Sequence, residues 1–276
     1  MYGVGVARPW PDTDGGADRG PAGRSELREV VGTRYVTALR EGGSLPGLVE
    51  ASDDGLYVVK FRGAGQGPLA LVAEVIVAEI ARRLGLPVPE LVRVQIDPAL
   101  GRAEPDPEIQ ELILSSPGTN LGIDFLPGAL PYSPAAGPQP QADVAADIVW
   151  LDGLTTNVDR TARNPNLLVW HRQLWLIDHG AALFRQHGGW HPAEDAGRPF
   201  PQIADHVLLA AAGPIGGADE RLAPRVDRAL LEQVVALVPP QWLTHASGAT
   251  YVDYLARRLE APRRFVEEAE RARAGA

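Results

Sequence analysis

Apolar and polar residues alternate with a strand-like period through most of the first half of the chain. The alternation predicts strands over residues 27–39, 48–51, 56–61 and 88–96, and a further short strand over 109–114. Residues 69–84 are rich in Ala, Leu and Ile, and Gly85 and Pro87 follow them, so a helix is predicted to end there. We therefore expect the first half to be mostly β with one main helix.

The second half has longer apolar stretches that favour helices. Helices are predicted over residues 142–154, 203–212, 226–238 and 251–274. A hairpin is predicted after the first of them, with strands over 167–170 and 175–177 and a turn over 171–174. A Pro-rich stretch, 127–141, separates the two halves. The pattern predicts an α+β protein with a disordered tail (1–24), an N-lobe (25–126), an inter-lobe segment (127–141) and a helical C-lobe (142–276).

Composition narrows the class of protein. The chain has 276 residues, of which 45% are hydrophobic and 22% charged, as in ordinary globular proteins. It lacks an apolar run near 18 residues, a secretory leader and any cysteine, so we expect a cytoplasmic protein without a membrane segment or disulfides. Its net charge of −9 argues against a broad nucleic-acid-binding face and against docking on anionic lipid.

Lys60 is the only lysine among 26 basic residues. A single lysine in a chain that otherwise uses arginine indicates a position where a compact ammonium is needed. The alternative is that one surface lysine has been retained by chance. Lys60 falls near the end of the predicted strand 56–61. The Gly-rich stretch that includes Gly42, Gly43 and Ser44 precedes this strand. Its backbone amides could cover phosphates, but it lacks the usual nucleotide-binding patterns and could equally be an ordinary hairpin loop.

Residues 156–166 are polar and contain an Asn-Pro break, which predicts a loop. The predicted hairpin follows, and its second strand leads directly into Asp178-His179-Gly180. This order brings Asp159, Asn164 and Asp178 to the same end of a small sheet. Oxygen-bearing side chains beside a Gly turn are what a magnesium–phosphate site needs.

Together, these motifs resemble the protein-kinase-like superfamily. The shared features are a lysine on a strand, a glutamate on a following helix, the D-x-x-x-x-N spacing from Asp159 to Asn164, and a D-x-G turn at 178–180. The form N-x-D-R-x-x-x-N at 157–164 is most similar to bacterial HipA-like kinases, an atypical branch related in motif to phosphoinositide kinases. The H-R-D and A-P-E motifs of ordinary protein kinases are missing from the sequence. The resemblance covers residues 39–184 and implies a two-lobed protein-kinase-like fold.

The resemblance also implies roles for single residues. Asp159 would receive the proton of the attacking hydroxyl, and Asn164 and Asp178 would hold Mg²⁺. Lys60 would bind the phosphates of ATP, positioned by a helix glutamate, for which Glu74 is chosen over Glu79. The cofactor-binding residues are then Lys60, Glu74, Gly42, Gly43 and Ser44, and the catalytic residues are Asp159, Lys60 and Arg160.

Arg160 has two interpretations from the sequence. It could steady the loop or contact phosphate, and a structural ion pair is the alternative. The function implied is an ATP- and Mg²⁺-dependent phosphotransferase whose acceptor is a protein Ser or Thr, with a small molecule as the other option. Two further hypotheses keep the fold: a catalytically inactive, nucleotide-binding pseudokinase that acts as a regulatory partner, and an enzyme that transfers AMP.

Overall fold

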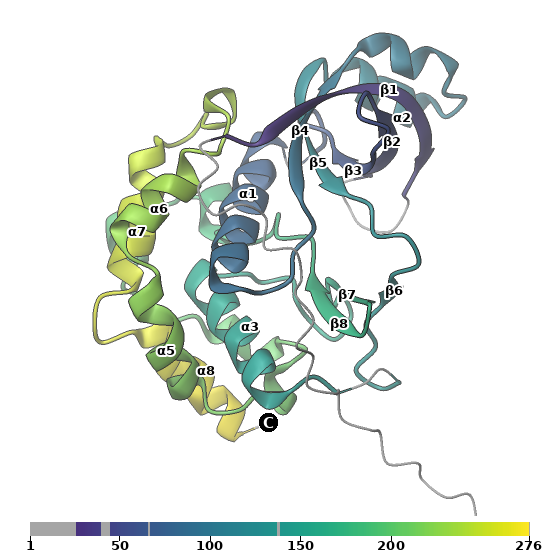
Figure 1. Cartoon of the computed structure of the whole chain (residues 1–276). Coiled ribbons are helices and arrows are strands. Elements are labelled where there is room, and N and C mark those ends of the chain that lie inside the picture. Colours follow the sequence, from purple (N-terminus) through teal and green to yellow (C-terminus); the bar gives the residue numbers. More distant parts are fainter. Residues whose placement is uncertain (1–25, 40–44, 66, 137–138, 276) are drawn as a thin grey trace, which may run out of the picture.

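The computed structural model of the chain describes residues 26–39, 45–65, 67–136 and 139–275. It has a β-rich N-terminal region and a helical C-terminal region (Figure 1), which confirms the predicted α+β class. The predicted tail over 1–24 and the Gly-rich residues Gly42, Gly43 and Ser44 lie outside the described residues. Within the described ranges, no helix combines the length and the apolar character needed to cross a membrane.

Five strands of the N-terminal region form a closed barrel in the order β1-β2-β3-β5-β4. Four of the pairings are antiparallel, and the barrel closes through the parallel pairing of β1 with β4, in which Arg28 lies opposite Val92. The barrel encloses its own apolar core, separate from the larger core of the helical region. The strands are β1 (Arg28–Ala38), β2 (Gly47–Ala51), β3 (Leu56–Lys60), β4 (Leu91–Ile96) and β5 (Gly118–Asp124).

Two glycines allow the barrel strands to pack closely. A Cβ atom on Gly122 would lie 2.5 Å from Cγ2 of Val94, and one on Gly47 would lie 2.5 Å from Cε2 of Tyr35. Both distances are far below ordinary carbon–carbon contact, so any larger residue would push the strands apart.

The segment between β4 and β5 is helical, and the predicted strand over 109–114 is wrong. It folds as the 3₁₀ helix η1 (Pro98–Ala103) and the helix α2 (Pro107–Leu114). The side chain of Asp106 caps α2 by accepting the backbone N–H of Glu108 at 3.0 Å. Ile109 and Ile113 are four residues apart, so they share one face of the helix, and that face packs into the barrel core.

The main predicted helix is confirmed as α1 (Gly67–Leu84), which lies between the barrel and the C-terminal helices (Figure 1). Every residue from Leu69 to Ala81 is buried, so the helix is covered on all sides. Side chains also tie it to the C-terminal region. Gln186 donates to the backbone oxygen of Leu69 at 3.1 Å and accepts from the hydroxyl of Tyr251 at 2.8 Å.

The polar loop (residues 156–166) is preceded by a helix and followed by a hairpin, as predicted. The helix is α3 (Ala142–Thr155), and the hairpin consists of β7 (Leu167–Trp170) and β8 (Gln173–Leu176). A short strand, β6 (Leu130–Pro131), adds to β7 and completes a three-stranded sheet. Arg258 anchors the end of α3 by donating to the backbone oxygens of Gly153 and Leu154, each at 2.7 Å.

The remaining helices differ from the sequence prediction in three places. The helix predicted over 203–212 is two 3₁₀ turns. The helix predicted over 251–274 is interrupted in a segment that contains Pro262. The helix over 215–222 was not predicted, because two glycines lower its helix propensity. The α-helices are α4 (Pro192–Asp195), α5 (Ile215–Leu222), α6 (Arg228–Val235), α7 (Gly248–Arg258) and α8 (Arg264–Ala274). The 3₁₀ helices are η2 (Phe184–His187), η3 (Pro201–Asp205), η4 (Leu209–Ala211), η5 (Ala223–Arg225) and η6 (Pro240–Trp242).

Candidate active site

The single lysine lies at the meeting point of three elements. Lys60 ends β3, and its Nζ donates to Oε1 of Glu74 on α1 and to Oδ1 of Asp178, 2.6 Å away, after β8. Both Lys60 and Glu74 are buried. Glu79 instead pairs with Arg82, at 3.1 Å. The structure therefore brings Lys60 to Glu74 and Asp178, and not to Glu79.

Burial and the charges of Lys60, Glu74 and Asp178 together decide which of these groups are ionised. Burial lowers the pKa of Lys60, but the negative charges of Glu74 and Asp178 outweigh it and raise this pKa above its usual value. Burial likewise raises the pKa of Asp178, but the ammonium of Lys60 outweighs it and lowers this pKa. At neutral pH the site therefore holds a charged ammonium facing a charged, partly exposed carboxylate.

The Asp178 turn (residues 178–180) packs closely against α1. Asp178 has a positive φ of 53°, and a Cβ on Gly180 would lie 3.3 Å from Oε1 of Glu74 and 3.4 Å from Cβ of Ala70. A bulkier residue at 180 would push the turn away from the helix. Gly180 thus allows the carboxylate of Asp178 to reach Lys60.

Asp159 is half-buried in the polar loop and is held by amide side chains. Its Oδ2 accepts from Nδ2 of Asn164 at 2.8 Å and from Nδ2 of Asn166 at 3.3 Å. Its backbone N–H donates to Oδ1 of Asn157 at 3.1 Å. The structure therefore brings Asp159 and Asn164 together, as the sequence predicted.

Asn166 belongs to this group but was not predicted from the sequence. Its backbone adopts φ of 49°, in the left-handed region that asparagine tolerates better than most residues. Besides contacting the Asp159 carboxylate, its Nδ2 donates to the backbone oxygen of Asp159 at 3.2 Å. The available signal was an asparagine that directly follows an Asn-Pro break and directly precedes a strand.

Asn164 and Asp178 have the chemistry that a divalent cation needs. The amide nitrogen of Asn164 is occupied by Asp159, which leaves its oxygen as the group available to a cation, and the side chain of Asp178 is 37% exposed. In the described ranges, no group of three or more His, Cys, Asp or Glu side chains could hold a metal. Two protein oxygens match Mg²⁺, which usually completes its shell with water and substrate phosphates.

Arg160 points into the protein and is only 1% exposed. Its Nε donates to Oδ2 of Asp152 at 2.5 Å, and its Nη1 donates to the backbone oxygens of Asn166 and Ile177, the latter at 3.3 Å. Its Nη2 lies 3.1 Å from Nδ1 of His179. Burial together with this guanidinium lowers the pKa of His179 to about 3, so its ring is neutral and accepts the hydrogen bond. The structure shows the structural ion pair that was the alternative for Arg160, and its bonds to Asn166 and Ile177 also steady the loop, whereas its burial leaves it no exposed face for a phosphate.

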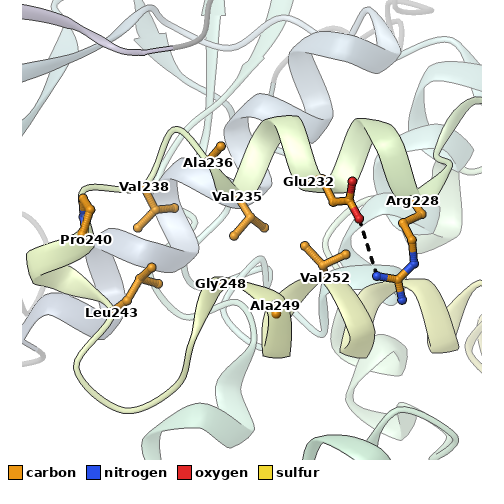
Figure 2. Close-up of a pocket in the computed structure, with 10 residues that line it drawn as sticks. All are labelled: Arg228, Glu232, Val235, Ala236, Val238, Pro240, Leu243, Gly248, Ala249 and Val252. Atoms are coloured by element: carbon orange, nitrogen blue, oxygen red, sulfur yellow. Dashed lines mark ion pairs between the residues drawn. The ribbon is translucent and has the colours of Figure 1, made fainter.

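A separate apolar groove lies between α6 and α7 (Figure 2). It has a volume of about 380 Å³ and is lined by apolar side chains such as Val235, Leu243 and Val252, with Arg228 and Glu232 at one end. None of the residues around Lys60 or Asp159 lines it. The groove is therefore a different feature from the candidate active site.

Comparison with known proteins agrees with this arrangement. A model of a protein family described as HipA-like kinase matches residues 33–193. The chain is similar to the crystal structure of CtkA, a proinflammatory kinase of Helicobacter pylori, with a TM-score of 0.51 and 13% identity over 88% of this chain and 97% of that chain. It is also similar to the Golgi casein kinase with Mn/ADP bound, with a TM-score of 0.53 and 13% identity over 90% of this chain and 74% of that chain. These structures confirm a protein-kinase-like fold. The search of curated protein sequences found no match to the chain.

Proposed function

This chain belongs to the HipA-like kinase family, and we propose that it transfers the γ-phosphoryl group of ATP to a hydroxyl acceptor with the help of a divalent cation. One observation carries the proposal: the buried ammonium of Lys60 contacts both the helix carboxylate of Glu74 and the turn carboxylate of Asp178. Phosphoryl transfer depends mainly on positioning and charge neutralisation, and this arrangement provides a fixed cation beside an accessible carboxylate.

Asp159 is the residue that would accept the proton of the acceptor hydroxyl. Two amide side chains occupy its Oδ2, which leaves Oδ1 for the hydroxyl of the acceptor. As the acceptor oxygen bonds to the γ-phosphorus, the bond from that phosphorus to the bridging oxygen of ADP breaks, and the hydroxyl proton passes to Asp159. Lys60 would bind the phosphates and offset their negative charge throughout.

Asn164 and Asp178 would hold Mg²⁺, which supplies charge neutralisation at the phosphates when it is bound. The Mn/ADP bound to the Golgi casein kinase supports nucleotide and divalent-metal use on this fold. Gly42, Gly43 and Ser44 lie outside the described residues, and we propose that their backbone amides cover the phosphates. We propose a protein Ser or Thr as the acceptor, and the similar Golgi casein kinase is named for a protein substrate.

The test is transfer of labelled phosphate from ATP with Mg²⁺ to casein and to a mixture of Ser/Thr peptides. Label from the γ-phosphate should be transferred by the wild type and lost in Asp159→Asn and Asp178→Asn. Asp54→Asn is the matched control, because Asp54 is exposed in a tight turn with a positive φ that asparagine accepts. Label retained from the α-phosphate instead would mean AMP transfer and would overturn the proposal.

A binding measurement separates an inactive nucleotide-binding protein from an active one. ATP with Mg²⁺ at about 100 times its dissociation constant should raise the free energy of unfolding by about 2.7 kcal/mol. Stabilisation without any transfer would favour the pseudokinase. If saturating ATP and Mg²⁺ give no stabilisation, the kinase and the pseudokinase hypotheses both fail.

A further inference from the structure

A buried carboxylate lies directly behind the polar loop. Asp152, in the last turn of α3, is 0% exposed, and its two oxygens accept four hydrogen bonds. Two come from Arg160, through Nε at 2.5 Å and Nη2 at 3.5 Å, and the others come from His206 Nε2 at 2.9 Å and Asn157 Nδ2 at 3.1 Å. A buried charge is tolerated only when it is paired and hydrogen-bonded in this way.

The charge on Asp152 is retained at neutral pH. Burial by itself raises the pKa of Asp152, but the charge of Arg160 and the hydrogen bond from His206 outweigh it and hold this pKa well below its usual range. Asp152 therefore presents a permanent negative charge to Arg160. Neither Asp152 nor Arg160 faces the surface where a nucleotide or acceptor would bind.

Arg160 connects this charge to both halves of the candidate active site. Its Nη1 donates to the backbone oxygen of Ile177, the residue before Asp178, and to that of Asn166, whose side chain contacts Asp159. Because one planar guanidinium makes these contacts together, it sets where the polar loop lies relative to the Asp178 turn. Asn157 gives a second link, since it bonds both to Asp152 and to the backbone N–H of Asp159.

His206 connects the same carboxylate to the His206 segment (residues 201–208). Its Nδ1 accepts the backbone N–H of Leu208 at 3.1 Å, so the ring proton lies on Nε2 and is donated to Asp152. His206 forms a β-bridge with Thr161, and the N–H of Val207 donates to the backbone oxygen of Arg160 at 3.0 Å. The His206 segment therefore runs along residues 160 and 161 of the polar loop, which follow Asp159 in the chain.

We propose that Asp152 is a positioning residue that acts through Arg160 and His206 to hold the polar loop, the Asp178 turn and the His206 segment at their working separations. The inference rests on the proposed phosphoryl transfer. Asp152 touches none of the reacting groups, so its loss should slow the chemical step and leave nucleotide binding largely intact. A displacement of about 1 Å in such a site can reduce the rate by about 100-fold.

The first experiment compares Asp152→Asn with Asp147→Asn, which makes the same change on the same helix, where Asp147 pairs with Arg221 at the surface. Transfer from ATP to the Ser/Thr peptide mixture is measured in Mg²⁺, and the fraction of folded sites is determined by ATP titration. We expect kcat per folded site to fall by about 10- to 100-fold in Asp152→Asn, with KM for ATP changed by less than about threefold. Asp147→Asn should keep both constants. An unchanged kcat per folded site in Asp152→Asn would overturn the inference.

A matched pair at His206 tests the network even if Asp152→Asn does not fold. The amide nitrogen of Gln can occupy the place of Nε2 and donate to Asp152, whereas Asn can replace only Nδ1 and accept from Leu208. We expect kcat to be about tenfold higher in His206→Gln than in His206→Asn, because only Gln keeps the contact with Asp152. Equal values, or a faster Asn variant, would contradict this.

The double variant Asp152→Asn with Arg160→Lys tests whether the two residues act as one unit. If Asp152 works through Arg160, the double variant loses little more kcat than the more impaired single variant. Losses in kcat that simply multiply would overturn the positioning role. The two proposals fail in different ways: a wild type that transfers no phosphate contradicts the proposed function, whereas an active wild type with an equally active, folded Asp152→Asn contradicts only this inference.

Discussion

The ammonium nitrogen of Lys60 lies 2.6 Å from Oδ1 of Asp178, a residue 118 positions later in the chain, and the same nitrogen contacts Glu74. On the proposed function, nucleotide phosphates and the carboxylate of Asp178 would share one buried cation. Burial raises the pKa of Glu74, and the positive charge of Lys60 opposes that rise. Removing the ammonium would therefore favour the neutral form of the Glu74 carboxyl group.

Lys60→Arg should largely abolish phosphate transfer although it keeps the positive charge. The planar guanidinium is larger than an ammonium and cannot occupy the space between Glu74 and Asp178 in the same way, so we expect a loss of kcat/KM of about 100-fold or more. Lys60→Met leaves the buried carboxylate without its partner and should lower the free energy of unfolding by about 3–5 kcal/mol. Initial rates and urea unfolding measure the two effects. A Lys60→Arg enzyme with the wild-type rate would show that no compact ammonium is needed.

Glu74→Gln and Glu79→Gln form a matched pair on one helix. Glu74→Gln removes the carboxylate that holds Lys60, so the rate of transfer should fall by about tenfold or more. Among the described residues, the bonding partner of the Glu79 carboxylate is Arg82, three residues later on the same helix and away from Lys60. Glu79→Gln should therefore keep its rate. Steady-state assays at saturating ATP make the comparison, and equal losses in both variants would contradict the assignment.

Asn166 combines a hydrogen bond to Asp159 with a left-handed backbone, and two substitutions separate these effects. Asn166→Gly and Asn166→Ala both lose the side-chain contact, so both should lose activity to the same extent. Only alanine adds backbone strain, which should make it less stable than the glycine variant by about 1 kcal/mol. Rates and thermal unfolding of the two variants are compared with the wild type. A stable, fully active alanine variant would exclude both roles.

His206 should make the protein sensitive to acid. Burial lowers its pKa below the ordinary 6.5 despite the opposing charge of Asp152, so below pH 6.5 the unfolded chain binds a proton that the native protein does not. Stability is therefore lost as pH falls through this range, by at most about 1.4 kcal/mol per pH unit for this one group. Urea unfolding at pH 7.0 and 5.5 should show a smaller loss for His206→Gln than for the wild type. Identical losses would mean that His206 does not titrate in this way.

Local sequence signals were sufficient for the parts of the site that lie within one loop or one strand. Asp159 and Asn164 are five residues apart in a single loop, and Lys60 stands out because no other lysine occurs. The order of elements predicted Asp178 at the same site, and the structure brings it to Lys60. The main error among the short elements is the strand predicted over 109–114. Asp106 and Pro107 are a capping signal that favours a helix, and the prediction did not take it into account.

The contacts around Asp152 could not be found in this way. His206 lies 54 residues beyond Asp152, and only the path of the intervening chain brings them together. The one local hint was an acidic residue directly after an apolar helical run, Ile148-Val149-Trp150-Leu151-Asp152. A carboxylate in such a position is expected to have a buried partner, but the sequence does not say which one.

The burial of α1 from Leu69 to Ala81 limits how the proposed activity could be controlled. Swinging this helix outward would separate Glu74 from Lys60, but it would also expose the apolar side chains of Val72, Ile76 and Ile80 and break the hydrogen bond from Gln186 to Leu69. A helix held in this way is poorly suited to act as an on–off switch. The ion pair between Lys60 and Glu74 is therefore held in place by the packing of α1. Restraint of the proposed activity would have to come from access to the site or from the supply of its acceptor.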